Sequence, residues 1–191
     1  MNKIIVILLV VLSIIGFCGY KSTVSANSAV YLDPNLDVKF VDYLYRDHRR
    51  LESYLLNVRE NDYNKFLYYM GIVAAASGND KDAVDYLSEA LKTSNNNPYI
   101  YEYRTIAYIQ SRDYENAIKD ANEAIKLLPQ DRNPLILRMK AYRLSKNYQD
   151  AIKDIELIQK LPVSNRDLMT PKSLKDTQMG LHIKIMEEKR P

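Results

Sequence analysis

The sequence predicts an all-α protein built as a stack of helical hairpins. Three alanines, Ala83, Ala117 and Ala151, follow one another at a constant interval of 34 residues. The apolar side chains after Ala117 recur at the i, i+1, i+4, i+7 and i+8 positions, which form one face of an α-helix. Helical patterning that repeats at a fixed interval of this length is typical of a solenoid rather than of one closed globule.

A short polar break follows the first helix of each hairpin at the same phase of the repeat. It consists of the pairs Ser77 and Asn79, Ser111 and Asp113, and Ser145 and Asn147. Asn and Asp side chains accept hydrogen bonds from the first backbone N–H groups of a helix. The break therefore predicts that the second helix of each hairpin starts directly after it.

Further start and stop signals complete the helix prediction. The dipeptides Asn97-Pro98, Asn133-Pro134 and Thr170-Pro171 each place a capping residue before a proline at the first helical position. Pro129 and Pro162 follow helix ends, because a helix does not continue through proline. The predicted helices lie near residues 63–76, 80–93, 98–111, 114–128, 132–145, 148–161 and 171–188. The last of them is amphipathic and is expected to cap the apolar side of the final hairpin.

The periodic alanines have a physical role in this arrangement. Two antiparallel helices of a hairpin approach closely at one point, and a small side chain there permits the contact. A larger residue at such a site costs about 1–3 kcal/mol through overpacking. We therefore expect Ala83, Ala117 and Ala151 to lie buried between the two helices of their hairpins.

The repeat resembles the tetratricopeptide repeat. Counted from Asn64, Pro98 and Arg132, the three alanines take place 20, which is small in that family. Other places agree with the family pattern, namely Gly71 at place 8, Tyr108 and Tyr142 at place 11, and Ala90 and Ala124 at place 27. Ala74, Met139 and Ile158 depart from it. The resemblance covers roughly residues 64–165 and implies a right-handed α-solenoid of three hairpins, residues 64–97, 98–131 and 132–165, within a repeat domain at 63–165.

Two further segments flank the repeats. Residues 27–62 form an N-terminal extension, in which the apolar residues of 36–60 have mostly helical spacing and predict one long helix or a broken pair. Place 20 of the family pattern would fall on Arg49 here, so we do not count a fourth repeat, and we expect this extension to cover the outer face of the first hairpin. Residues 166–191 hold the C-terminal capping helix.

The first residues predict export. One charged residue, Lys3, precedes an apolar run from Ile4 to Phe17, and small residues before Asn27 suit cleavage after Ala26. Residues 1–26 are therefore predicted to be a signal peptide of a periplasmic, cell-envelope or extracellular protein. The sequence leaves two alternatives for this segment: a retained membrane anchor, or lipid attachment at Cys18. Membrane association would then follow from the N-terminal segment.

Composition and motifs argue against catalysis, cofactors and nucleic acid. The chain has 27 Lys+Arg against 24 Asp+Glu, so its charge lacks the basic excess of a nucleic-acid-binding protein. Its two histidines, His48 and His182, are far apart and have no partner at metal-ligand spacing. The chain contains no glycine-rich phosphate loop and no nucleophile elbow. We therefore expect neither an enzyme nor a bound cofactor or metal.

The resemblance implies a binding groove. In the tetratricopeptide family, the first helix of each hairpin lines a concave surface that contacts another protein or peptide. The resemblance implies that the groove residues of this chain are Tyr68, Tyr69, Ile72, Tyr99, Glu102, Tyr103, Ile106, Ile109, Ile136, Leu137, Lys140 and Arg143. Exposed apolar and aromatic side chains of this kind mark contact sites.

The sequence therefore predicts an exported, non-catalytic adaptor that binds an unidentified protein or peptide through this groove. The alternative function is a membrane-tethered structural subunit of a cell-envelope assembly, held by a lipid or by a signal anchor.

Overall fold

The computed structural model describes residues 33–188, apart from the side chain of His48. The predicted signal peptide and Cys18 lie outside the described residues. Within them, the chain forms nine α-helices and no β-strand. These are α2 (Val38–Arg46), α3 (His48–Asn61), α4 (Tyr63–Ala76), α5 (Asp80–Leu91), α6 (Pro98–Gln110), α7 (Tyr114–Leu127), α8 (Arg132–Leu144), α9 (Tyr148–Lys160) and α10 (Pro171–Glu188).

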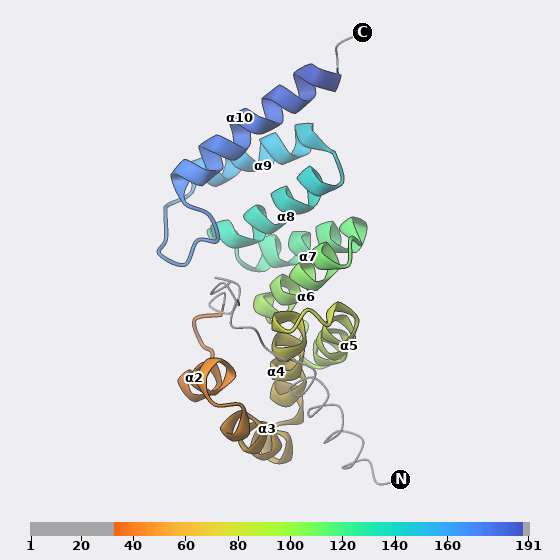
Figure 1. Ribbon diagram of the computed structural model, residues 1–191, viewed down its shortest axis with the longest axis vertical. Helices are drawn as coiled ribbons and strands as arrows, with labels where there is room; N and C mark the ends of the chain where they lie inside the picture. The colour runs from red at the N-terminus through yellow and green to blue at the C-terminus, as the bar shows by residue number, and fades with distance from the viewer. Residues whose placement is uncertain (1–32, 189–191) are drawn as a thin grey trace.

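Consecutive helices pack against one another along the whole stack, from α2 and α3 at one end to α10 at the other (Figure 1). The hairpins are α4 with α5, α6 with α7, and α8 with α9. The first helices also contact each other directly, α4 with α6 and α6 with α8, whereas α5, α7 and α9 approach one another less closely. The first helices therefore line the inner side of the stack, and the predicted all-α solenoid of helical hairpins is confirmed.

The periodic alanines lie where the repeat predicts them. The side chains of Ala83, Ala117 and Ala151 are completely buried. A second close approach involves Gly71 of α4, where an added Cβ atom would overlap the Cγ atom of Leu87 in α5. The equivalent positions in the next hairpin hold Thr105 and Ala121, both fully buried. The first two hairpins therefore place the larger residue of this pair on opposite helices, whereas the third has Met139 and Ile155, both large and buried.

The turn inside each hairpin has the same backbone geometry three times. Gly78, Arg112 and Lys146 occupy equivalent positions and have positive φ angles of 73°, 65° and 64°. The following residue closes the turn by donating its backbone N–H to a carbonyl five residues earlier. These bonds are Asn79 to Ala74 at 2.9 Å, Asp113 to Tyr108 at 2.8 Å, and Asn147 to Tyr142 at 2.8 Å. This is the Schellman ending, in which the left-handed residue is most easily a glycine.

Most of the predicted caps are confirmed. Asn97 caps α6 through its side chain, with Pro98 at the first helical position, and Thr170 accepts a hydrogen bond from the Ser173 backbone N–H of α10. The cap predicted at Asn133 is wrong. Helix α8 begins at Arg132 under an Asp131 cap, and Asn133 lies inside the helix.

The caps expected at the second helices are also present in two of three hairpins. Asp113 accepts a hydrogen bond from the backbone N–H of Asn116, and Asn147 accepts one from that of Asp150. Asn79 makes no such bond to the backbone of α5; its side-chain amide donates to Asp82 instead.

The N-terminal extension forms the broken pair of helices that was one of two alternatives. Asp47 ends α2 and caps α3. Helix α3 packs against α4 at the end of the stack. The extension does not stop at this outer face, because Phe40 of α2 stacks on Tyr69 of α4 with 4.0 Å between ring centroids. Tyr69 is one of the predicted groove residues, so α2 lies partly over the inner side.

Candidate functional site

The predicted groove residues divide into a buried group and an accessible group. All of them lie on α4, α6 and α8, as the repeat predicts. The buried residues are Tyr68, Tyr69, Ile72, Glu102, Tyr103, Ile136 and Leu137. The accessible or partly accessible residues are Tyr99, Ile106, Ile109, Lys140 and Arg143. All three of these positions on α4 are buried. On α6 and α8, apart from Tyr99, the buried positions lie in the N-terminal half of the helix and the accessible ones in the C-terminal half.

Helix α2 supplies part of this cover on α4. Phe40 is fully buried between α2 and α4, where it stacks on Tyr69. Tyr54 of α3 lies beside the same ring, at 6.2 Å between centroids. These aromatic contacts make Tyr69 a core residue, so an external partner does not reach it without displacing α2.

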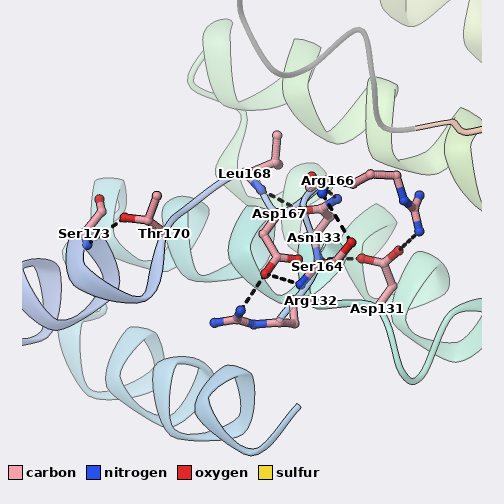
Figure 2. Close-up of polar contacts among 9 residues, drawn as sticks. All are labelled: Asp131, Arg132, Asn133, Ser164, Arg166, Asp167, Leu168, Thr170 and Ser173. Atoms are coloured by element: carbon pink, nitrogen blue, oxygen red, sulfur yellow. Dashed lines mark hydrogen bonds and ion pairs between the residues drawn. The ribbon is translucent and has the colours of Figure 1, made fainter. Parts of the chain in front are cut away.

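The connector between α9 and α10 covers the start of α8 (Figure 2). The Asn133 side chain donates to the Arg166 carbonyl at 3.1 Å and accepts from the Leu168 backbone N–H at 2.8 Å. Arg132 pairs with Asp167 of the same connector, and both side chains are buried. Leu168 packs against the apolar clusters of both ends of the stack. The connector is therefore an integral part of the fold.

A pocket of about 340 Å³ lies between this connector and the loop that joins α7 to α8. Its lining includes Leu127 at the end of α7, Pro129 and Val163 from the two loops, and the charged residues Arg132 and Asp167. The charged groups of the lining pair with one another, Arg132 with Asp167 and Arg166 with Asp131.

One groove residue has an unusual environment. Glu102 of α6 is fully buried, and neither of its carboxylate oxygens has a hydrogen-bond partner. Burial raises the pKa of Glu102 well above its ordinary value; the charge of Asp131 adds to this and that of Arg166 opposes it. Asp33 lies nearby, where it accepts a hydrogen bond from the Tyr68 hydroxyl at 3.0 Å. The sequence places Glu102 in the groove but gives no sign of its missing partner.

The open C-terminal halves of α6 and α8 form a surface that we call the open half-groove. It consists of Ile106, Ile109, Gln110, Lys140, Arg143 and Leu144, of which Leu144 is 42% exposed. Residues 105–110 and 139–144 contain no Asp or Glu. Partial burial lowers the pKa of Lys140, and the charge of Arg143 adds to this effect. The open half-groove thus combines apolar area with positive charge that has no carboxylate on the same helix segments.

The described residues show no metal-binding cluster of His, Cys, Asp and Glu side chains. Between residues 33 and 188, no helix combines the length and the apolar character needed to span a membrane.

No protein-family model and no curated protein sequence matches the chain. The structure resembles the solved Arabidopsis OM64 TPR domain with a TM-score of 0.56 and 20% sequence identity. The match covers 64% of this chain and 96% of that domain. Such a likeness establishes the fold. The helices of this chain, packed in sequence as antiparallel pairs, therefore have the tetratricopeptide repeat domain fold.

Proposed function

We propose that the protein is an exported, non-catalytic adaptor that binds a segment of another protein on its open half-groove. The observation that supports this most directly is the accessible pairing of apolar and basic side chains on α6 and α8. Ile109 and Leu144 offer apolar contact area, and Lys140 and Arg143 offer positive charge. A solenoid of this kind gives a partner a rigid, extended contact surface.

The chemistry of the surface defines the partner. An amphipathic segment would place its apolar side chains on Ile109 and Leu144. An Asp or Glu in the same segment would pair with Lys140 or Arg143. The partial burial of Lys140 disfavours its charge in the free protein, so a carboxylate from the partner would relieve that cost. The preferred partner is therefore an acidic amphipathic segment.

A photo-crosslinking experiment tests the location of this surface. A photoreactive amino acid is placed at Arg143, which is exposed, and a matched one at Glu156 on the outer side of α9. Crosslinking in the organism that makes the protein should join a partner to position 143 and not to position 156. Equal crosslinking of the same partner at both positions contradicts the open half-groove as the binding surface.

Affinity measurements with the captured partner then test the chemistry. Arg143→Glu replaces an attractive charge by a repulsive one, and Leu144→Ser removes apolar contact. Each should weaken binding by at least about tenfold, which corresponds to about 1.4 kcal/mol. Lys160→Glu makes the same charge change at an exposed position of α9 and should leave the affinity unchanged. Unaltered binding by both groove variants contradicts the proposal.

The export part of the proposal is supported by the apolar leader sequence and is tested separately. Mass spectrometry of the protein from its native source should find Asn27 as the first residue. Acylated Cys18 at the N-terminus would instead indicate a lipoprotein, and intact Met1 would indicate a signal anchor.

A second candidate function, a structural subunit of an envelope assembly, is supported by α10. The face of α10 that points away from the core carries Met179, Ile183 and Met186, which are 62%, 51% and 66% exposed. Three exposed apolar side chains on one helix face suit contact with another subunit. Ile183→Lys should disrupt such an assembly in native extracts while leaving the helical circular dichroism unchanged. An assembly of unchanged size argues against this role.

A further inference from the structure

Helix α10 lies at the end of the stack, with one side buried and the other uncovered (Figure 1). Leu174 and Leu181 are buried in the apolar cluster that α10 shares with α8 and α9. The opposite side of α10 is exposed along the helix, although it carries Met179 and Ile183. Exposed apolar side chains rimmed by charged ones are typical of an interaction surface.

The exposed side chains of α10 form two rows in which successive members are four residues apart. Such rows are the ridges through which α-helices pack against one another. The first row is Lys172, Asp176, Gly180, Lys184 and Glu188, and the second row is Lys175, Met179, Ile183 and Glu187. The two rows contain every Lys, Asp and Glu of α10, three positive and three negative. The exposed face is therefore neutral in sum, and the order of its charges decides what it can bind.

The charges of the first row are self-complementary in an antiparallel pair of helices. Consider this row running against the same row of a second copy of the chain, with the two copies of Gly180 opposite each other. Lys172 then lies opposite Glu188. Asp176 lies opposite Lys184, and each of these contacts occurs twice because the pair is symmetric. Every charge of the row thereby meets a charge of the opposite sign.

The second row has the same property when it is reversed. Lys175 comes opposite Glu187, and the apolar side chain of Met179 comes opposite that of Ile183. A parallel pair would instead place each charge opposite its own copy, which is repulsive. Within one helix, Lys184 also pairs with Glu187 at 3.3 Å, but both side chains are more than half exposed and such a pair competes weakly.

Gly180 lies at the centre of the first row, midway between Asp176 and Lys184. Glycine inside a helix is destabilising relative to alanine. A Cβ atom added at Gly180 would meet no atom of the described residues within 4 Å, so the packing of this part of the chain does not require a glycine there. In the antiparallel pair the two copies of Gly180 face each other, and the missing side chains let the two backbones approach closely.

We propose that the protein forms a homodimer through α10, with the two copies of the helix antiparallel and crossing at Gly180. The interface is isologous, because the same surface of each chain meets its copy across a two-fold axis. Apolar side chains supply contact area, and the charges fix direction and register. The occupant of the α10 face is thus a second copy of this chain. This inference does not depend on what binds the open half-groove.

Light scattering after size-exclusion chromatography tests the dimer on the purified protein, in the processed form that its source makes. Wild type should have twice the mass of one chain and should dissociate on dilution. Asp176→Lys and Lys184→Glu each set like charges opposite each other and should raise the dissociation constant of the dimer by at least about tenfold. Asp85→Lys makes a matched change at an exposed position of α5 and should leave it unchanged.

Mixing the two charge-reversal variants tests the pairing itself. Each variant is repelled by its own copy, whereas a pair made of one Asp176→Lys chain and one Lys184→Glu chain brings opposite charges together at both contacts. An equimolar mixture should therefore form the dimer that each variant alone forms poorly. Both substitutions in one chain should restore the homodimer for the same reason.

A cysteine at the crossing point tests the location. Gly180→Cys should give a disulfide-linked dimer on mild oxidation, because the two copies of this position face each other, and Asp85→Cys should not. The proposal is overturned if purified wild type stays monomeric at every concentration, or if both charge-reversal variants dimerise as tightly as wild type. Either result leaves the adaptor function and a contact of α10 with a different subunit open to their own tests.

Discussion

Arg104 and Asp120 form a bidentate ion pair between the two helices of the second hairpin. The Nε and Nη2 atoms of Arg104 donate to the two carboxylate oxygens of Asp120 at 2.6 and 2.8 Å. The same guanidinium donates through Nη1 to Ser88 of the preceding hairpin at 2.8 Å. The identical arrangement returns 34 residues later, where Arg138 donates to Asp154 and to Asn122. Each arginine thus joins its own hairpin to the one before it.

The first hairpin replaces this pair by apolar contact. Met70 stands at the position of Arg104, and Tyr86 stands at the position of Asp120. Met70 is almost completely buried in the core of that end of the stack. The fold therefore accepts two solutions at this point of the repeat.

We predict that breaking the ion pair on one side is strongly destabilising. Asp120→Ala leaves Arg104, whose side chain is 17% exposed, without its counter-charge. The free energy of unfolding should fall by about 3–5 kcal/mol, because an unpaired charge stays buried. Adding Arg104→Met to Asp120→Ala should recover part of this loss. Urea unfolding of the two single variants and the double variant measures the coupling.

The exposed pair between Glu115 and Lys119 on α7 provides the control. Glu115→Ala should change the stability by less than about 1 kcal/mol, since exposed ion pairs contribute little. Equal effects of Asp120→Ala and Glu115→Ala would refute the structural role of the buried pair.

The left-handed turn residues predict a stabilising substitution. Lys146 and Arg112 hold positive φ angles that disfavour residues with a Cβ atom. Lys146→Gly should therefore raise the free energy of unfolding by about 0.5–1 kcal/mol, measured by urea unfolding. In the opposite sense, Gly78→Ala should lower it at the equivalent turn. A loss of stability in Lys146→Gly would show that the lysine side chain contributes more than the strain costs.

The contact between Gly71 and Leu87 predicts a compensating pair of changes. Gly71→Ala should destabilise the protein by about 1–3 kcal/mol, because the new methyl group overlaps the Leu87 side chain. The next hairpin solves the same contact with Thr105 and Ala121. Combining Gly71→Thr with Leu87→Ala should accordingly be less destabilising than Gly71→Thr alone. Thermal unfolding of the three variants decides this, and additive losses would contradict it.

Lys140 should oppose stability while supporting binding. Because burial lowers its pKa from the ordinary 10.5, the unfolded state binds more protons than the folded state between the two pKa values. The stability of the wild type should therefore rise with pH across the alkaline window that ends near 10.5. Lys140→Met should lack this rise, be more stable at neutral pH, and bind the acidic partner more weakly.

Urea unfolding at several pH values and affinity measurements with the captured partner test both effects. Lys160→Met removes an exposed lysine and provides the control, with neither effect expected. Parallel stability curves for wild type and Lys140→Met would show that Lys140 does not titrate as proposed.

The helices were predictable from the sequence because their signals are local. Every predicted helix of the repeats is present with ends within two residues of those expected, since caps such as Asn97 and the periodic alanines act over a few residues. The Asn133 cap was misassigned because Asp131, two residues earlier, takes that role and frees Asn133 to hold the connector.

Which groove residues are buried was less predictable, because the segments that bury them lie far away in the sequence. Nothing near Tyr69 in the sequence shows that Phe40 stacks on it, and nothing near Asn133 shows that Leu168 returns to it. The arginine–aspartate pairs did leave a signal, since Arg104 and Arg138, like Asp120 and Asp154, recur at the repeat interval. Oppositely charged residues that recur at the repeat interval therefore predict ion pairs between the two helices of a hairpin, as recurring alanines predict close helix contacts.

The bonds from each arginine to the hairpin before it make residues 98–131 a module that can be duplicated. In a chain with two tandem copies, the second Arg104 would find Asn122 where the first finds Ser88, and Arg138 already accepts that partner. The one new junction of the longer solenoid would therefore use an arginine–asparagine bond of the kind that Arg138 and Asn122 make in the natural molecule.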